Sequence, residues 1–182
     1  MSEKTLQEHG INDECIAIIK EILGDKKLVL NPMQVDFVKK GFLEKEKVVI
    51  SAPPASGKTL LVHLKYAKIV GNERKRMIYL VPYIRIRREL LKKLSKWEKV
   101  GIVSTSVYKT YEEGKAQILV ATYAYIDHLL LSGKKPTSDF FVFDEVDMIT
   151  DDLQGTKTES SISRIIRESE VSTLFALSAT IG

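Results

Sequence analysis

The stretch SAPPASGKT, residues 51–59, constrains the fold of this 182-residue chain more than any other feature. It follows the apolar run VVISA (48–52) and precedes TLLVHLKYAKIV, whose apolar residues recur with helical spacing. A strand, a loop of small residues and a helix in this order form a P-loop, whose backbone N–H groups cradle phosphates. Gly57, Lys58 and Thr59 match the pattern G-x-x-x-x-G-K-[ST], and Ala52 stands where the first glycine is usual. The alternative is a strand-to-helix turn without a ligand.

Short apolar runs alternate with helical patterns along the rest of the chain, which is typical of an α/β domain. Strands are predicted at 48–52, 77–81, 100–104, 118–122, 140–144 and 173–178. Helices are predicted near 58–70, 83–98, 123–132 and 158–168. Several strands are apolar at successive positions, as parallel strands buried on both faces are. We therefore expect a mostly parallel sheet with helices on both faces.

Two further helices are predicted before the P-loop. The first carries apolar residues at helical spacing from Ile11 to Leu23, with Asn12 as a possible N-cap and Gly24 at its end. The second begins at Asn31 and closes near Gly41.

Composition and charge narrow the classes of function. The sequence has no secretory leader and no run of about 18 apolar residues, so we expect an intracellular protein, cytoplasmic or nucleoid/nuclear, without a membrane partner. The single cysteine, Cys15, and the three histidines show no metal-ligand spacing. Residues 85–99 hold seven Lys or Arg against two Glu. This segment indicates either a nucleic-acid surface or a solvated helix face.

A second motif strengthens the nucleotide hypothesis. The apolar run FFVF ends in Asp144 and Glu145, and parallel sheets bind ligands at the carboxyl ends of their strands. Asp144 is expected to hold Mg²⁺ together with the Thr59 hydroxyl, and Glu145 to orient and deprotonate the attacking water. A solvated loop of acids is the alternative.

In this order, APPASGKT, DEVD and SAT (178–180) resemble motifs I, II and III of superfamily 2 helicases. The segments around Gln34, YLVPYIRIRREL and ATYAYIDHLL resemble further motifs of the same family, and the likeness is greatest to its processive DExH group, which acts in RNA surveillance and DNA repair. The resemblance implies a RecA-like P-loop NTPase domain over residues 30–182, preceded by a helical extension over 1–29. It also implies ATP and Mg²⁺ as cofactors and DNA or RNA as partner.

The resemblance assigns roles to particular residues. Gln34 would read adenine, although with Asn31 it could instead form a capping box. The remaining assignments are Lys58, Asp144 and Glu145 for catalysis; Ala55, Ser56, Gly57, Lys58 and Thr59 for the nucleotide; Thr59 and Asp144 for the metal; Asp147, Ser178 and Thr180 for coupling; and Arg85, Arg88 and Thr122 for nucleic acid.

Three positions depart from the family pattern. Asp147 replaces the histidine usual in the DExH group, and Ile84 stands where a basic residue is usual, with Arg85 one place late. The segment 105–107 (TSV) replaces a Thr-Gly-Asp type motif.

SAT lies two residues before the end of the sequence, where the linker to a second RecA-like domain would begin. We therefore expect a first-domain fragment that binds ATP weakly and hydrolyses it slowly, since loss of an arginine finger costs about 10³- to 10⁵-fold in rate. Two alternatives remain open from the sequence: a P-loop kinase, and a degenerate nucleotide-dependent nucleic-acid-binding module.

Overall fold

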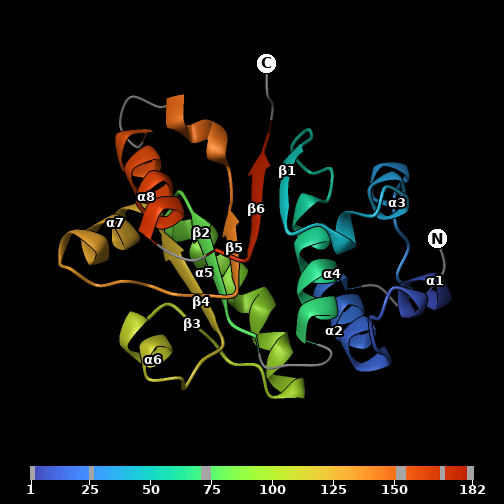
Figure 1. Cartoon of the computed structure of the whole chain (residues 1–182). Coiled ribbons are helices and arrows are strands. Elements are labelled where there is room, and N and C mark those ends of the chain that lie inside the picture. The colour runs from blue at the N-terminus through green and yellow to red at the C-terminus, as the bar shows by residue number, and fades with distance from the viewer. Residues whose placement is uncertain (1–2, 25–26, 71–74, 151–154, 169–170, 180–182) are drawn as a thin grey trace.

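A central parallel sheet organises the computed structural model, which describes residues 3–24, 27–70, 75–150, 155–168 and 171–179. Its strands follow the order β1-β6-β5-β2-β4-β3, and every neighbouring pair is parallel (Figure 1). The strands are β1 (Lys47–Ser51), β2 (Met77–Val81), β3 (Ser104–Thr105), β4 (Ile118–Thr122), β5 (Phe140–Phe143) and β6 (Thr173–Ser178). The predicted α/β class and parallel sheet are confirmed.

Helices cover both faces of this sheet. Figure 1 shows α4 and α2 on one side of it and α7 and α8 on the other. The helices are α1 (Glu3–Glu8), α2 (Asp13–Leu23), α3 (Pro32–Lys39), α4 (Lys58–Val70), α5 (Ile84–Leu94), α6 (Tyr108–Glu112), α7 (Tyr123–Leu131) and α8 (Gly155–Glu168), with 3₁₀ turns η1 (Phe42–Glu44), η2 (Ser95–Val100) and η3 (Val146–Thr150). Among the described helices, none has the length and apolar content needed to span a membrane.

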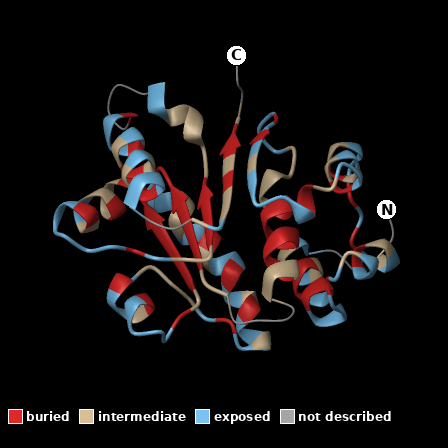
Figure 2. Ribbon diagram, viewed as in Figure 1, coloured by how far each residue is buried: buried red, intermediate tan, exposed pale blue. Residues whose placement is uncertain are grey.

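The strands contribute to two apolar cores because successive side chains point to opposite faces. In β2, Met77, Tyr79 and Val81 pack on the α4 side, while Ile78 and Leu80 pack on the α7 and α8 side. Figure 2 shows the central strands buried along their length. This arrangement explains why these strands are apolar at consecutive positions.

The N-terminal helices belong to the core on the α4 side. Asn12 caps α2 through a bond from the Cys15 N–H, and Gly24 ends the helix in the left-handed conformation. Leu6, Ile11 and Ile19 are buried in the same apolar cluster as α4. Residues from α1 and α2 therefore pack into the domain rather than standing apart from it.

The predicted strand at 100–104 is wrong in its extent. Residues Ser95–Val100 form the 3₁₀ turn η2, which ends at Gly101 with φ of 75°, and pairing with β4 is limited to Ser104 and Thr105. The predicted helix at 83–98 accordingly ends at Leu94. The short helices α1 and α6 were not expected, because five or six residues carry too little periodicity to reveal a helix.

Candidate active site

The P-loop lies where β1 ends and α4 begins, as predicted. The Ala52 N–H donates to the Ser178 carbonyl at 3.2 Å, which extends the β1–β6 pairing by one residue. Gly57 has φ of 88°, and the only described non-glycine residues with positive φ are Ala55 and Glu145. Ala52 is outside that set, so the backbone tolerates alanine where the P-loop pattern has its first glycine.

Lys58 is the first residue of α4, and its ammonium is held by the loop itself. Nζ donates to the carbonyl of Ala52 at 2.5 Å and to that of Pro53 at 3.0 Å. These contacts hold the cation against the loop that leads into α4. A phosphate placed there would meet both the ammonium and the positive end of the helix dipole.

Gln34 joins α3 to the P-loop. Its Oε1 accepts from the Asn31 N–H at 2.9 Å and completes the predicted capping box, while Nε2 donates to the Gly57 carbonyl at 3.1 Å. The Asn31 amide donates in the same way to the Ser56 carbonyl at 2.8 Å. Gln34 is buried, and its side-chain amide still has one N–H and one lone pair without a partner in these two bonds. Contact between Gln34 and adenine stays a prediction.

The positive φ of residue 57 favours glycine, and the contact between Gln34 and the loop adds a steric reason. A Cβ there would lie 2.2 Å from Gln34 Nε2, whereas a Cβ at Gly10, which has a similar φ of 84°, meets nothing within 4 Å. Both Gly→Ala changes strain the backbone. We expect Gly57→Ala to lower the free energy of unfolding by about 1–2 kcal/mol more than Gly10→Ala, because it also displaces Gln34. Urea denaturation of both variants checks this, and equal losses would contradict it.

Asp144 and Glu145 follow β5 at the same edge of the sheet as the P-loop. Asp144 is paired at its N–H with the Leu80 carbonyl at 2.9 Å, and Glu145 has φ of 52°. Such a left-handed conformation at a non-glycine residue is strained and is found where function fixes the backbone. Burial raises the pKa of the Asp144 carboxyl. Burial, and then the charges of Asp144 and Asp147, raise the pKa of Glu145, which suits a group that accepts a proton.

Two tyrosines that the sequence reading missed contact Asp144. The Tyr79 hydroxyl donates to Asp144 Oδ2 at 2.9 Å, and the Tyr123 hydroxyl donates to the Asp144 carbonyl oxygen at 2.8 Å. Both tyrosines are buried. No local pattern could have revealed them, because they lie 65 and 21 residues from Asp144 in the sequence.

Asp147 contacts the end of β6. Its Oδ1 accepts from the Ala179 N–H at 3.1 Å, so the residue that replaces the family's histidine bonds directly to the SAT segment. Ser178 is buried and accepts from the Ala52 N–H through its carbonyl. Thr180, the third predicted coupling residue, lies outside the described residues.

The P-loop and the Asp-Glu pair line one cavity of about 440 Å³. It brings residues 54–60 together with Asp144, Glu145 and Ala179, and Leu23, Ile86 and Lys93 complete its wall. Sequence reasoning did not place the last three there, since they come from α2 and α5. The oxygen donors of Thr59 and Asp144 suit Mg²⁺, which binds one or two carboxylates plus phosphate oxygens. Among the described residues, no cluster of three or more His, Cys, Asp or Glu could hold a metal ion.

The residues predicted to contact nucleic acid differ in their exposure and in the bonds that they make within the chain. Arg85 is exposed and pairs with Glu89 at 3.1 Å, and Arg88 is exposed on the same helix. The Thr122 hydroxyl is buried and caps α7 by accepting from the Tyr125 N–H at 3.3 Å. Further along the basic segment, Glu21 of α2 pairs with two lysines, Lys96 at 3.1 Å and Lys99 at 2.5 Å.

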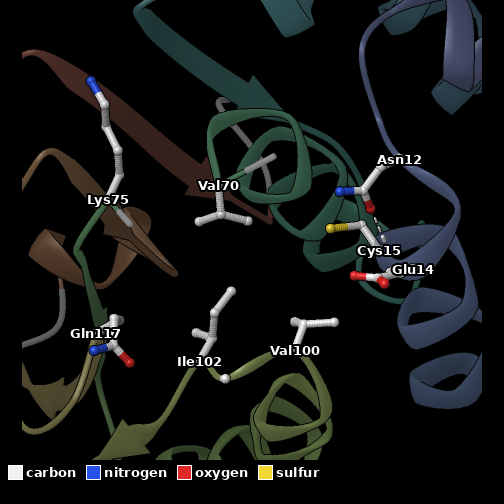
Figure 3. Close-up of a pocket in the computed structure, with 9 residues that line it drawn as sticks. Asn12, Glu14, Cys15, Val70, Lys75, Val100, Ile102 and Gln117 are labelled. Carbon is white, nitrogen blue, oxygen red and sulfur yellow. Dashed lines mark hydrogen bonds between the residues drawn. The ribbon is translucent and has the colours of Figure 1, made fainter. Parts of the chain in front are cut away.

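A second pocket, of about 210 Å³, lies at the opposite edge of the sheet, where α4 ends and β2 and β4 begin. Figure 3 shows Asn12, the N-cap of α2, and Cys15 of α2 facing Val70 and Ile102, with the Lys75 side chain directed away from them. Burial raises the pKa of the Cys15 thiol to about 11, which leaves it protonated and unreactive at neutral pH. This pocket contains none of the motif residues and is separate from the candidate active site.

The parallel sheet, the P-loop at its carboxyl edge and the facing Asp-Glu pair define a RecA-like P-loop nucleotide-binding domain. The chain belongs to the DEAD/DEAH box helicase family, whose family model matches residues 31–182. The resemblance to superfamily 2 helicases is thereby confirmed.

Individual relatives agree with this family. The chain is 31% identical over 172 residues to "ATP-dependent DNA helicase Hel308" of Pyrococcus abyssi, an alignment that covers 90% of this chain and 24% of the relative. It is 30% identical over the same length to the proteins of that name in Thermococcus kodakarensis and Pyrococcus horikoshii, of which 15% and 24% are covered. The chain thus spans less than a quarter of each of these relatives.

Proposed function

We propose that this chain is the ATP-binding domain of an ATP-dependent DNA helicase. The observation that carries the proposal is the convergence of Lys58, Thr59, Asp144 and Glu145 on one cavity at the carboxyl edge of a parallel sheet. The family match favours this function over a P-loop kinase. The name of the relatives favours DNA over RNA as the substrate.

Each residue has a defined role in this proposal. Lys58 exchanges its bonds to the loop carbonyls for bonds to the phosphates. Thr59 and Asp144 would hold Mg²⁺, which would neutralise charge on the phosphates. Glu145, whose pKa is raised, accepts the proton of the attacking water. Gln34 lies against the P-loop and contacts the adenine.

Unwinding needs a second RecA-like domain. This proposal assigns residues 30–182 to the first RecA-like domain of a longer protein and residues 1–29 to a helical extension, and it places the second domain in the remainder of that protein. Asp147 and Ser178, together with Thr180, couple the nucleotide to that domain, since Asp147 already bonds the end of β6. The 182-residue chain alone is expected to bind Mg²⁺-ATP and to hydrolyse it slowly, because an arginine finger contributes about 10³- to 10⁵-fold.

DNA binding is assigned to the exposed face of α5, which begins at the same sheet edge as the cavity. Arg85 and Arg88 would contact the DNA phosphates. The buried Thr122 would position the start of α7 and would not itself contact the DNA. Contacts of this kind make affinity fall as salt rises.

Charge reversal tests this assignment. We expect Arg88→Glu to weaken binding of a fluorescein-labelled single-stranded oligonucleotide roughly tenfold and to reduce the slope of log affinity against log salt. Arg167→Glu makes the same charge change on the last turn of α8, remote from this edge, and should have little effect. Fluorescence anisotropy at several salt concentrations measures both. Equal losses for the two variants would contradict the assignment to α5, and absence of binding by the unaltered chain would contradict the DNA-binding role itself.

A further inference from the structure

Asp144 is held by tyrosine hydroxyls from two different elements of the fold. Tyr79 comes from the middle of β2, and Tyr123 is the first residue of α7. Each is 1% exposed. The first bonds the side chain of Asp144 and the second its backbone, at 2.9 and 2.8 Å. Tyr79, on the strand next to β5, thus bonds the carboxylate of Asp144, and Tyr123, on the opposite face of the sheet, bonds its backbone carbonyl.

Every polar group of Asp144 has a partner. Its N–H donates to the Leu80 carbonyl, and its carbonyl oxygen accepts from Tyr123. Of the two carboxylate oxygens, Oδ1 accepts from the Glu145 N–H at 3.0 Å and Oδ2 accepts from Tyr79. Because the two oxygens are fixed from different directions, the carboxylate plane cannot rotate without losing a bond. Each oxygen still has lone-pair capacity for a further partner.

The Tyr79 hydroxyl serves this contact rather than packing. Tyr79 faces the α4 core, where its neighbours on the same side of β2, Met77 and Val81, have no polar atom that needs a partner. A phenylalanine would fill the same space, whereas a buried hydroxyl has a desolvation cost unless it is hydrogen-bonded.

Thr59 and Asp144 are the two residues that the proposed function assigns to Mg²⁺, and both line the same cavity. They are 85 positions apart in the sequence, Thr59 on α4 and Asp144 after β5. The Tyr79 hydroxyl, from β2, holds one carboxylate oxygen of Asp144 at this cavity.

We infer that Tyr79 is a positioning residue that fixes the Asp144 carboxylate relative to Thr59 for Mg²⁺-nucleotide binding, with Tyr123 fixing the Asp144 backbone. This inference rests on the proposed function. Residues that orient metal ligands in this way typically change metal affinity 10- to 100-fold when they are replaced.

The test compares nucleotide binding with and without Mg²⁺ in the 182-residue chain, using a fluorescent ADP analogue. We expect Tyr79→Phe to reduce the Mg²⁺-dependent gain in affinity about tenfold, while affinity in EDTA stays within about twofold of the unaltered chain. Tyr123→Phe is expected to act in the same direction by about threefold, because it reaches the backbone only. Tyr66→Phe is the matched control: it removes another buried hydroxyl, bonded to the Lys75 carbonyl at 3.3 Å, and should leave the Mg²⁺ effect unchanged.

The outcomes separate the inference from the proposed function on which it rests. If the unaltered chain binds no nucleotide under either condition, the proposed function is contradicted. The unaltered chain can instead show a Mg²⁺-dependent gain in affinity that Tyr79→Phe and Tyr123→Phe retain as fully as the control Tyr66→Phe. That result overturns the positioning role, even if Tyr79→Phe and Tyr123→Phe have lower melting temperatures.

A double-mutant cycle adds a second measurement. In an Asp144→Asn background, Tyr79→Phe should have no further effect on the Mg²⁺-dependent gain, because the group that it positions is gone. An undiminished tenfold effect in that background would overturn the inference.

Discussion

Replacing Lys58 with alanine should weaken Mg²⁺-ATP binding by the 182-residue chain roughly 10- to 100-fold, the effect of losing a charge-assisted hydrogen bond to phosphate. The Lys58 ammonium is already held over the P-loop by the carbonyls of Ala52 and Pro53, so little ordering is needed when a phosphate arrives. Titration with a fluorescent ATP analogue measures the change. Full affinity in Lys58→Ala would contradict the assignment of SAPPASGKT as the phosphate-binding loop.

The control for Lys58→Ala must have the same change in net charge. Lys47→Ala provides it, because Lys47 is exposed at the start of β1, the end of the strand remote from the P-loop. We expect its nucleotide affinity to stay within about twofold of the unaltered chain, since exposed charges at that distance are largely screened at physiological salt. A similar loss in both variants would attribute the effect to net charge rather than to the site.

Acidification should destabilise the domain through His63, by at most about 3 kcal/mol. His63 is buried in α4 with its ring stacked on Trp97 at 6.3 Å, and its Nε2 has no hydrogen-bond partner among the described residues. Burial, and then the charge of Lys93, lower the pKa of His63 to about 4 from 6.5. Between pH 6.5 and 4, His63 therefore binds a proton in the unfolded chain and not in the folded chain. The free energy of unfolding is unaffected by His63 above pH 6.5 and falls progressively as the pH is lowered from 6.5 toward 4.

The measurement is urea denaturation at pH 7 and pH 5 for the unaltered chain and for His63→Phe, which keeps a ring against Trp97. The difference in unfolding free energy between the two proteins should shift in favour of His63→Phe at pH 5. Carboxylates with shifted pKa values are the same in both proteins, so their contributions to the pH dependence cancel in this difference. His128→Phe replaces an exposed histidine and should leave the pH dependence as it is. If the His63→Phe difference is the same at both pH values, buried His63 is not the source of acid sensitivity.

Much of the fold followed from local and periodic signals. The helix at 58–70, the strands at 77–81, 118–122 and 173–178, and the caps at Asn12 and Asn31 lie where the sequence predicted them. Such features depend on neighbouring residues, on caps and on burial of both strand faces, all of which are visible in the sequence. The predicted strand at 100–104 was wrong in its extent because an apolar run indicates burial and not strand conformation. Ile102 is buried, but Val100 belongs to the 3₁₀ turn η2 and the strand pairing with β4 begins at Ser104.

The sequence by itself determined that Lys58, Thr59, Asp144 and Glu145 lie at the carboxyl edge of a parallel sheet, since each follows an apolar strand and that edge is shared. Only the tertiary structure decided what surrounds them. The contacts of Tyr79 and Tyr123 with Asp144, of Gln34 with Gly57 and of Leu23 with the cavity join elements that are distant in the chain. They depend on the strand order and on which face each side chain points to, and no spacing within a single segment encodes either one.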